Sequence, residues 1–190
     1  MVNTSRDESD PQNFNEIHRF FDLSPDLLAI IAPDGYFKRL NPAWETTLGF
    51  TIAEILASPI FDSIHTDDIP LTVATLEKLI DGRPNVTFEN RYRCKDGTYR
   101  WLEWTSHYYE QDALIYSVAR DITNRKETEA GEQKNLREFI NAFPGLTVVT
   151  DLDGQLVTFN QQFAQRYSKP DVDLESQNIF DLLSPLNAQQ

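Results

Sequence analysis

The chain has 190 residues, 40% of them hydrophobic and 12% aromatic, which suffices for one core of roughly 100 to 150 residues and a smaller remainder. Its 30 acidic and 17 basic residues give a formal net charge of -13, which argues against nucleic acid as a partner. One cysteine cannot form an internal disulfide, and neither a membrane span nor a signal peptide is recognisable, so a cytoplasmic protein is expected.

The first predicted elements are a flexible segment and a hairpin. Residues 1–16 are expected to be disordered or flexible. The apolar run LLAII (27–31) and the extended pattern YFKRL (36–40) predict two strands, because Asp34 and Gly35 between them have turn chemistry.

Short helices should follow the hairpin. Asn41 is expected to cap the first of them, and Gly49 to end it. Thr51 and Glu54 have the spacing of a capping box for a second helix. A longer helix is predicted from Asp67 or Asp68 to Gly82 (range 67–82).

Three strands complete the pattern. Residues 86–94 alternate in polarity, Asp96-Gly97 suits a type I′ hairpin turn, and 99–109 is apolar on both faces. After a turn, LIYSVARDI (114–122) forms the last strand. The order of two strands, several helices and three strands predicts an α+β fold, with an antiparallel sheet and helices on one face.

The chain also contains an internal repeat. An offset of 119 positions places Phe20 on Phe139, Asp34-Gly35 on Asp153-Gly154 and Asn41 on Asn160, and the register holds without a gap as far as His65. The second copy includes only the first hairpin and the short helices.

Four pieces of the sequence together resemble a PAS domain with its C-terminal PAC motif: NPAWETTLGFTIAEIL, the step His65 to Asp68, YRCKDGTYRWLEW and ARDITNRK. The resemblance implies a PAS-like five-stranded antiparallel sheet over residues 17–124. Residues 139–190 resemble the N-terminal half of a second PAS domain. Because the partner strands of this incomplete second copy are missing, it is expected to be poorly ordered or paired with another chain.

Residues 125–138 join the two copies and are rich in helix formers. The resemblance implies a helical signalling linker, which could pair in a dimer through Leu136, Phe139 and Ile140. A merely solvated connector is the alternative, because the apolar stripe is thin.

Cysteine and histidine offer little chemistry. Cys94 has basic neighbours that could activate a thiol, but no base, orienting group or oxyanion site accompanies it, so it is interpreted as a strand residue. His18, His65 and His107 are scattered, and His65 is interpreted as a loop or cap residue. No catalytic residues and no metal site are predicted.

The resemblance also bears on cofactors. Flavin photoreceptors of this family place a reactive cysteine in a motif like NCRFLQ, where this sequence has SPIFDSI with Ile60 at that position. Haem-binding relatives use a histidine of the long helix, and residues 69–81 contain none. A flavin photoadduct and histidine-ligated haem are therefore disfavoured, and the cofactor is unknown.

Two groups of residues are candidates for function. Asp121 and Thr123 are expected to couple the sheet to the following helix, as the resemblance implies, or simply to cap that helix. The alternatives at the core are a filled interior and a ligand pocket. The pocket candidates are Ile30, Leu40, Trp44, Phe61, Leu76, Ile80, Phe88, Asn90, Tyr92, Leu102, Trp104 and Tyr116.

The resemblance implies a sensory or regulatory module without catalysis of its own. Such modules form the N-terminal input region of bacterial signal-transduction proteins, such as the histidine kinases of two-component systems or cyclic dinucleotide enzymes. A homodimer, an effector domain beyond residue 190 and a small-molecule ligand are the partners expected. Two alternatives remain: a ligand-free dimerisation module using Trp101, Tyr109 and the helix around 17–21, or a small enzyme acting through Cys94.

Overall fold

The computed structural model describes residues 11–82, 86–168 and 173–183. They belong to two compact units, Met1–Lys126 and Glu127–Gln190, each of which is described by itself. Among the described residues, no helix combines the length and the apolar character that crossing a membrane requires.

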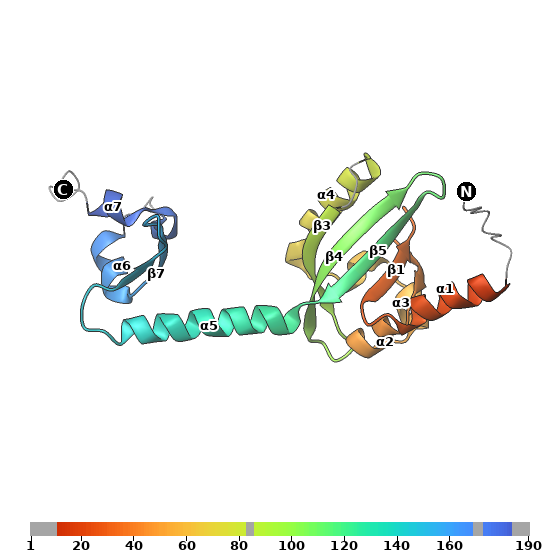
Figure 1. Ribbon diagram of the computed structural model, residues 1–190, viewed down its shortest axis with the longest axis horizontal. Coiled ribbons are helices and arrows are strands. Elements are labelled where there is room, and N and C mark those ends of the chain that lie inside the picture. The colour runs from red at the N-terminus through yellow and green to blue at the C-terminus, as the bar shows by residue number, and fades with distance from the viewer. Residues whose placement is uncertain (1–10, 83–85, 169–172, 184–190) are drawn as a thin grey trace, which may run out of the picture. The chain divides into compact units, whose positions relative to one another are not determined.

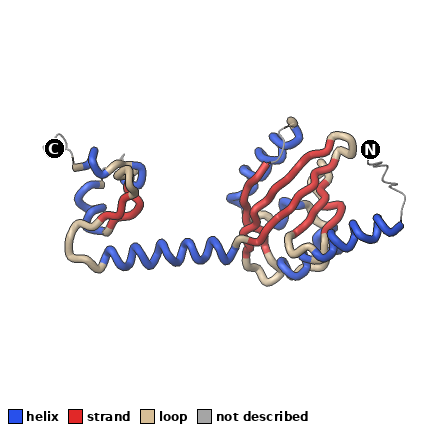
Figure 2. Tube along the Cα trace, in the orientation of Figure 1, coloured by secondary structure: helices blue, strands red, loops and turns tan. Residues whose placement is uncertain are grey.

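The first unit is built on a five-stranded antiparallel sheet in the order β2-β1-β5-β4-β3 (Figures 1 and 2). The strands are β1 (Leu27–Ile31), β2 (Phe37–Leu40), β3 (Val86–Arg93), β4 (Tyr99–Tyr109) and β5 (Leu114–Asp121). The helices are α1 (Pro11–Leu23), α2 (Ala43–Leu48), α3 (Ile52–Leu56) and α4 (Ile69–Ile80), with 3-10 turns at Ile60–Ser63 and Thr66–Asp68. The predicted α+β class is confirmed.

One face of this sheet, called the inner face here, carries the core. Leu102 of β4 and Ala119 of β5 are completely buried on it, and they share an apolar cluster with Trp44 of α2 and Leu79 of α4. These residues alternate along their strands with outward-facing ones, as a sheet that is covered on one face by helices requires.

The opposite, outer face is bordered by α1. Arg39 of β2 anchors this helix, since its Nη2 lies 2.7 Å from His18 Nδ1 and its guanidinium carbon 4.4 Å from the Phe21 ring centre. The helix begins at Pro11. Residues 11–16, which were predicted to be disordered or flexible, are therefore helical, whereas 1–10 lie outside the described residues.

Both Asp-Gly turns of the first unit have the same hydrogen-bond pattern, and at Asp96-Gly97 it is not the predicted type I′. At the β3–β4 connection, Gly97 N–H donates to Cys94 O (3.0 Å) and Cys94 N–H donates to Thr98 O (2.8 Å). Gly97 has φ +87°, while Asp96 keeps a negative φ. This is a three-residue loop closed by a glycine bulge, because a type I′ turn needs positive φ at both central residues.

At the end of α4, Asp81 rather than the predicted Gly82 is the C-cap. The ends of α2 and α3 follow the predictions with one exception. The capping box of Thr51 and Glu54 is present, and Gly49 ends α2 with φ 78°. The exception is Asn41, whose side chain does not cap α2. Its Oδ1 accepts from Leu28 N–H at 2.9 Å instead, because the hairpin returns that unpaired strand amide beside it.

The predicted linker is one continuous helix, α5 (Thr123–Asn141), which passes through Gly131 without a break. It extends beyond the predicted 125–138 at both ends. From Glu127 onward the helix belongs to the second unit, where Ile140 is buried and Asn141 Oδ1 accepts from Gln161 N–H at 2.7 Å.

The second unit repeats the first half of the first. Its described elements are β6 (Val148–Thr150), β7 (Leu156–Phe159), α6 (Gln161–Tyr167), a 3-10 turn at Leu174–Ser176 and α7 (Ile179–Leu182). The strands pair Val148 with Phe159, at the same register as Ala29 with Leu40. Each pair of strands has its irregularity at the equivalent place.

The hydrogen bonds of the repeat match as well. Asn160 Oδ1 accepts from Thr147 N–H at 3.1 Å, the counterpart of the bond from Leu28 to Asn41. Ile179 N–H donates to Gly154 O at 2.8 Å, as Ile60 does to Gly35. The repeat inferred from the sequence is therefore a structural one.

The described part of the second unit is folded around a small core of Leu156, Phe163 and Ile179. Expected poor order is thus wrong for 139–168 and 173–183, because the hairpin and α6 bury these side chains among themselves. Residues 169–172 and 184–190 lie outside the described residues. Pairing with another chain stays a prediction.

Candidate ligand cleft and output junction

The interior of the first unit, where the sequence predicts a pocket, is occupied by aromatic side chains. Trp44 is fully buried, with its ring centre 5.9 Å from Tyr92 and 5.8 Å from Trp104. Phe88 stacks on Trp104 at 6.1 Å. With Leu40 and Leu102 beside them in the same cluster, these candidates pack against one another as a close-packed interior does.

The two polar candidates are also engaged within the protein. Asn90 accepts from Trp104 Nε1 at 2.7 Å and donates to Thr72 Oγ1 at 3.1 Å. Burial raises the pKa of the Tyr92 phenol well above its usual value, so it stays neutral. Asn90 therefore joins β3, β4 and α4 in the core.

A cleft of about 170 Å³ lies between α4 and the turn from β1 to β2. Ile31, Ile60 and Ile115 form its buried wall. Phe61, Leu76 and Ile80, three of the predicted pocket residues, line it with Val73. The cleft is mostly apolar, and its volume is close to the roughly 150 Å³ at which an apolar cavity accommodates benzene.

Two predicted pocket residues lie on the wrong face for a pocket. Ile30 pairs with Tyr116 across β1 and β5, one position out of phase with the buried pair of Ile31 and Ile115, so both point outward. The Tyr116 hydroxyl donates to Asp112 Oδ2 at 3.1 Å. Partial burial, and then this bond, raise the pKa of Tyr116.

Cys94 lies where a strand residue is expected. Its side chain is 5% exposed, and Sγ lies 3.9 Å from Thr47 O. The neighbouring Lys95 ammonium binds Glu54 at 2.8 Å rather than the thiol. The cysteine is thus part of the apolar cluster at the end of the sheet.

The histidines are spread over the first unit. His65 precedes a 3-10 turn and its Nδ1 accepts from Asp67 N–H at 3.3 Å, so it is a cap residue as interpreted. His107 packs its ring against Tyr109 on the outer face, and His18 contacts Arg39. Within residues 11–82, 86–168 and 173–183, no three potential metal ligands come together.

Asp121 and Thr123 form the junction between β5 and α5. Asp121 Oδ1 accepts from Thr123 N–H at 2.9 Å, which is the predicted cap. The Thr123 hydroxyl oxygen accepts from Trp101 N–H at 2.9 Å, and Ile122 N–H donates to Trp101 O at 2.9 Å. Since Thr123 is only 6% exposed, the start of α5 is fastened to β4 as well as capped.

An ion pair that the sequence did not reveal links α4 to the sheet. Asp68, next to the first residue of α4, accepts from Arg91 N–H and Nε at 2.8 Å and from Nη2 at 2.7 Å. The Arg91 hydrogen bonds hold the pKa of Asp68 below its usual value. Position 91 faces outward in the strand pattern, but nothing in the sequence indicates a partner 23 residues earlier.

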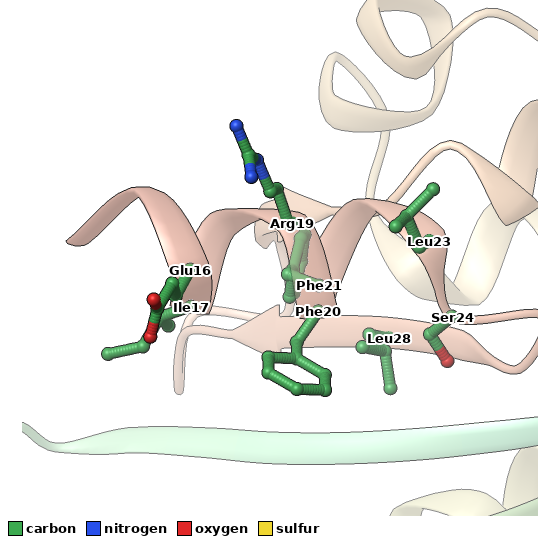
Figure 3. Close-up of a pocket in the computed structure, with 8 residues that line it drawn as sticks. All are labelled: Glu16, Ile17, Arg19, Phe20, Phe21, Leu23, Ser24 and Leu28. Atoms are coloured by element: carbon green, nitrogen blue, oxygen red, sulfur yellow. The ribbon is translucent and has the colours of Figure 1, made fainter. Parts of the chain in front are cut away.

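A shallow apolar groove of about 810 Å³ runs along α1 on the outer face. Figure 3 shows Phe20 pointing toward the space beside Leu28, while Arg19 points away. Phe20 is 81% and Leu23 80% exposed, so the groove is a surface rather than an enclosed site. The helix around 17–21 therefore presents an apolar stripe, as the dimerisation alternative requires.

Comparisons with known proteins agree with this architecture. A family model described as PAS fold matches residues 37–118, and a model described as PAS domain matches residues 144–190. The first match runs from β2 into β5, and the second coincides with the repeat of the hairpin and short helices. Residues 37–118 and residues 144–190 are therefore each similar to PAS domains.

A curated relative is the methyl sulfide methyltransferase-associated sensor of Methanosarcina acetivorans, to which the chain is 31% identical over 124 residues. The alignment covers 64% of this chain but 12% of the relative, so the chain spans only a small part of that sensor's length.

Solved structures confirm the fold. A domain of a sensory box sensor histidine kinase/response regulator from Geobacter sulfurreducens has a TM-score of 0.51 at 24% identity, covering 57% of this chain and 94% of that one. A PAS domain from Colwellia psychrerythraea has a TM-score of 0.53 at 21% identity, covering 59% and 98%.

Proposed function

We propose that the first unit is a sensory module that binds a small, largely apolar molecule in the cleft beside α4 and passes the change to α5. The observation that carries the proposal is that α4 lines the cleft with Val73, Leu76 and Ile80, and is tied at its start to the sheet by Asp68. The same sheet fastens the start of α5. Because both helices are attached to this sheet, a movement of α4 can change how the start of α5 is held.

The module acts without catalysis of its own and serves as input to a larger signalling protein, such as a histidine kinase or a cyclic dinucleotide enzyme. The named sensor that shares 31% identity supports this role, because the aligned part is a small portion of a long protein. In the same proposal, residues 139–190 are the N-terminal half of a second PAS domain. The match of a PAS model to 144–190 supports that assignment.

Toluene is a suitable probe of the cleft, since it is small enough for the volume and as apolar as most of the lining. Titration of the full chain, followed by backbone amide chemical shifts, should perturb residues 31–35 and 73–80. Val73→Trp, which fills the cleft, should abolish these changes. Leu71→Trp places the same side chain on an exposed position of α4 outside the cleft and should leave them intact.

Perturbation confined to the groove of Ile17, Phe20 and Leu28 would contradict the cleft as the binding site. Native mass spectrometry of the purified chain adds an independent result. A mass excess of a defined small molecule in the parent, absent in Val73→Trp, is expected if the ligand copurifies.

The second candidate function is ligand-free dimerisation through the groove along α1. The exposed stripe of Ile17 and Phe20 recurs on α5 as Leu136 and Phe139, at the offset of the repeat. A mostly apolar surface, lined also by Glu16 and Arg19 of opposite charge, favours an equally apolar partner, and a second copy supplies one. Sedimentation should then show that Phe20→Glu dissociates a dimer while Leu71→Glu does not. A parent that is monomeric at high concentration would exclude this candidate.

A further inference from the structure

Trp101 contacts the start of α5 directly and is linked to α4 through Arg91. It lies on the outer face of β4, and its backbone holds the start of α5 through the bonds with Ile122 and Thr123. Two cations lie over its ring. The Arg91 guanidinium carbon lies 5.1 Å from the ring centre, and Lys126 Nζ lies 5.3 Å from it.

The two cations come from different parts of the unit. Arg91 belongs to β3 and is held by Asp68, which directly precedes α4. Lys126 belongs to the first turn of α5, and its ammonium also pairs with Glu89. The neighbouring Arg125 pairs with Glu89 and Glu103 at 3.1 Å.

These contacts form a continuous series from the cleft to the output helix. α4 lines the cleft, Asp68 ties the start of α4 to Arg91, the Arg91 cation rests on Trp101, and Trp101 holds α5 by backbone and ring. Each step is a direct contact, so a shift of α4 that moves Asp68 must also move the Arg91 guanidinium relative to the Trp101 ring. Lys126 is affected in turn, because it shares that ring.

We propose that Trp101 is the positioning residue that couples α4 to α5 across the outer face of the sheet. This role rests on the proposed sensory function and names the residue through which the module is regulated. Asp121 and Thr123 fasten the helix in the same place, and the hydrogen bonds and ion pairs of the described residues link them to each other, to Trp101 and to Arg100 rather than to Arg91 or α4. Trp101 therefore accounts for the transmission and these two residues for the attachment.

The coupling can be tested without any ligand by a double-mutant cycle. Asp68→Asn weakens the tie of α4 to Arg91, and Trp101→Leu removes the shared ring. The readout is hydrogen exchange of the amides of Ile122, Thr123 and Lys126, each of which donates a hydrogen bond at the junction. Urea unfolding of each variant separates local opening from global destabilisation.

Asp68→Asn alone should raise exchange at the junction by about two- to fivefold, the effect of losing one partly exposed charge interaction. In the Trp101→Leu background the same substitution should add nothing, since the route is already interrupted. Tyr109→Leu, which removes another outer-face aromatic of β4, should leave the effect of Asp68→Asn unchanged.

The role of Trp101 would be overturned if the two substitutions multiplied each other's effect on the exchange rates at the junction. It would also be overturned if Asp68→Asn left those rates unchanged. Failure of toluene to bind the cleft would instead contradict the proposed function while leaving this cycle readable. If both proposals hold, toluene still binds the cleft of Trp101→Leu, but its binding no longer changes hydrogen exchange at the Lys126 amide.

Discussion

Asn41 connects the first strand, the chain before it and the second strand through one side chain. It is fully buried, accepts from Leu28 N–H, and donates to Ser24 O at 3.1 Å and Asp26 O at 2.9 Å. Its counterpart Asn160 makes two of these bonds in the second unit, accepting from Thr147 N–H and donating to Gly145 O. An amide carries both donors and an acceptor, which explains why this residue type suits the place in both copies.

Asn41→Ala should therefore lower the free energy of unfolding of the first unit by about 2–3 kcal/mol, because it leaves buried backbone groups without partners. Urea denaturation followed by tryptophan fluorescence measures this change, since Trp44 and Trp104 are in the core of that unit. Thr46→Ala, which removes an exposed hydroxyl, is the control and should cost below about 0.5 kcal/mol. Equal costs for both variants would contradict the account.

Asp68 supplies a pH-dependent contribution. Since Arg91 holds its pKa below the usual value of about 3.9, the folded state binds its proton less readily than the unfolded state does. The stabilisation is present above about pH 4 and is lost as the pH falls through the lowered pKa.

The parent should thus lose more unfolding free energy between pH 7 and pH 3 than Asp68→Asn loses, as urea denaturation at both values would measure. The excess should be about 1 kcal/mol or less, because pH 3 lies only about one pH unit below the pKa of Asp68 in the unfolded chain. Other carboxylates with lowered pKa values, such as Asp26 beside Arg120, cancel in this comparison. Identical pH dependences would mean that the pair contributes nothing.

At the scale of elements, the hairpins show what sequence patterns can and cannot predict. The Asp-Gly pairs located both turns of the first unit correctly. The turn type was wrong because it depends on which flanking residues pair, and Cys94 pairs with Thr98 to enclose three residues rather than two. That register is determined by the packing of β3 and β4, which a local pattern does not contain.

Two glycine substitutions should have opposite effects on stability. Gly97 has φ +87° with open space around it, so Gly97→Ala is strained only by its backbone and should cost about 1–2 kcal/mol. Gly131 lies within α5 with open space around it, so Gly131→Ala should raise helix stability by about 0.5–1 kcal/mol. Urea denaturation and far-UV circular dichroism compare the two, and the same sign for both would be inconsistent with these conformations.

At the scale of the whole molecule, the internal repeat explains why both units contain the same hairpin followed by short helices. The offset of 119 was visible in the sequence because it preserves turn glycines, the two asparagines and apolar spacing. The strand phases were likewise predictable, with Leu102 and Trp104 on one face and Trp101 on the other. The filled interior was not, since how Trp44, Tyr92 and Trp104 interlock depends on packing between distant segments.

The candidate site was predicted only in part for the same reason. Phe61, Leu76 and Ile80 do line the cleft, but Ile30 and Tyr116 are on the opposite face. The cap formed by Asp121 and Thr123 is confirmed, and their coupling role stays a prediction. Asp68, Arg91 and the ring of Trp101 were missed, because their contacts join elements whose order along the chain gives no indication of them.

According to the proposed function, a molecule bound in the cleft changes the hydrogen bonding at the start of α5. Hydrogen exchange of the full chain with and without toluene, at concentrations that leave the far-UV spectrum unchanged, tests it most directly. We expect toluene to increase protection at residues 73–80 and to alter exchange at Ile122, Thr123 and Lys126. Neither change should occur in Val73→Trp. Protection at 73–80 with no change at the junction would contradict it.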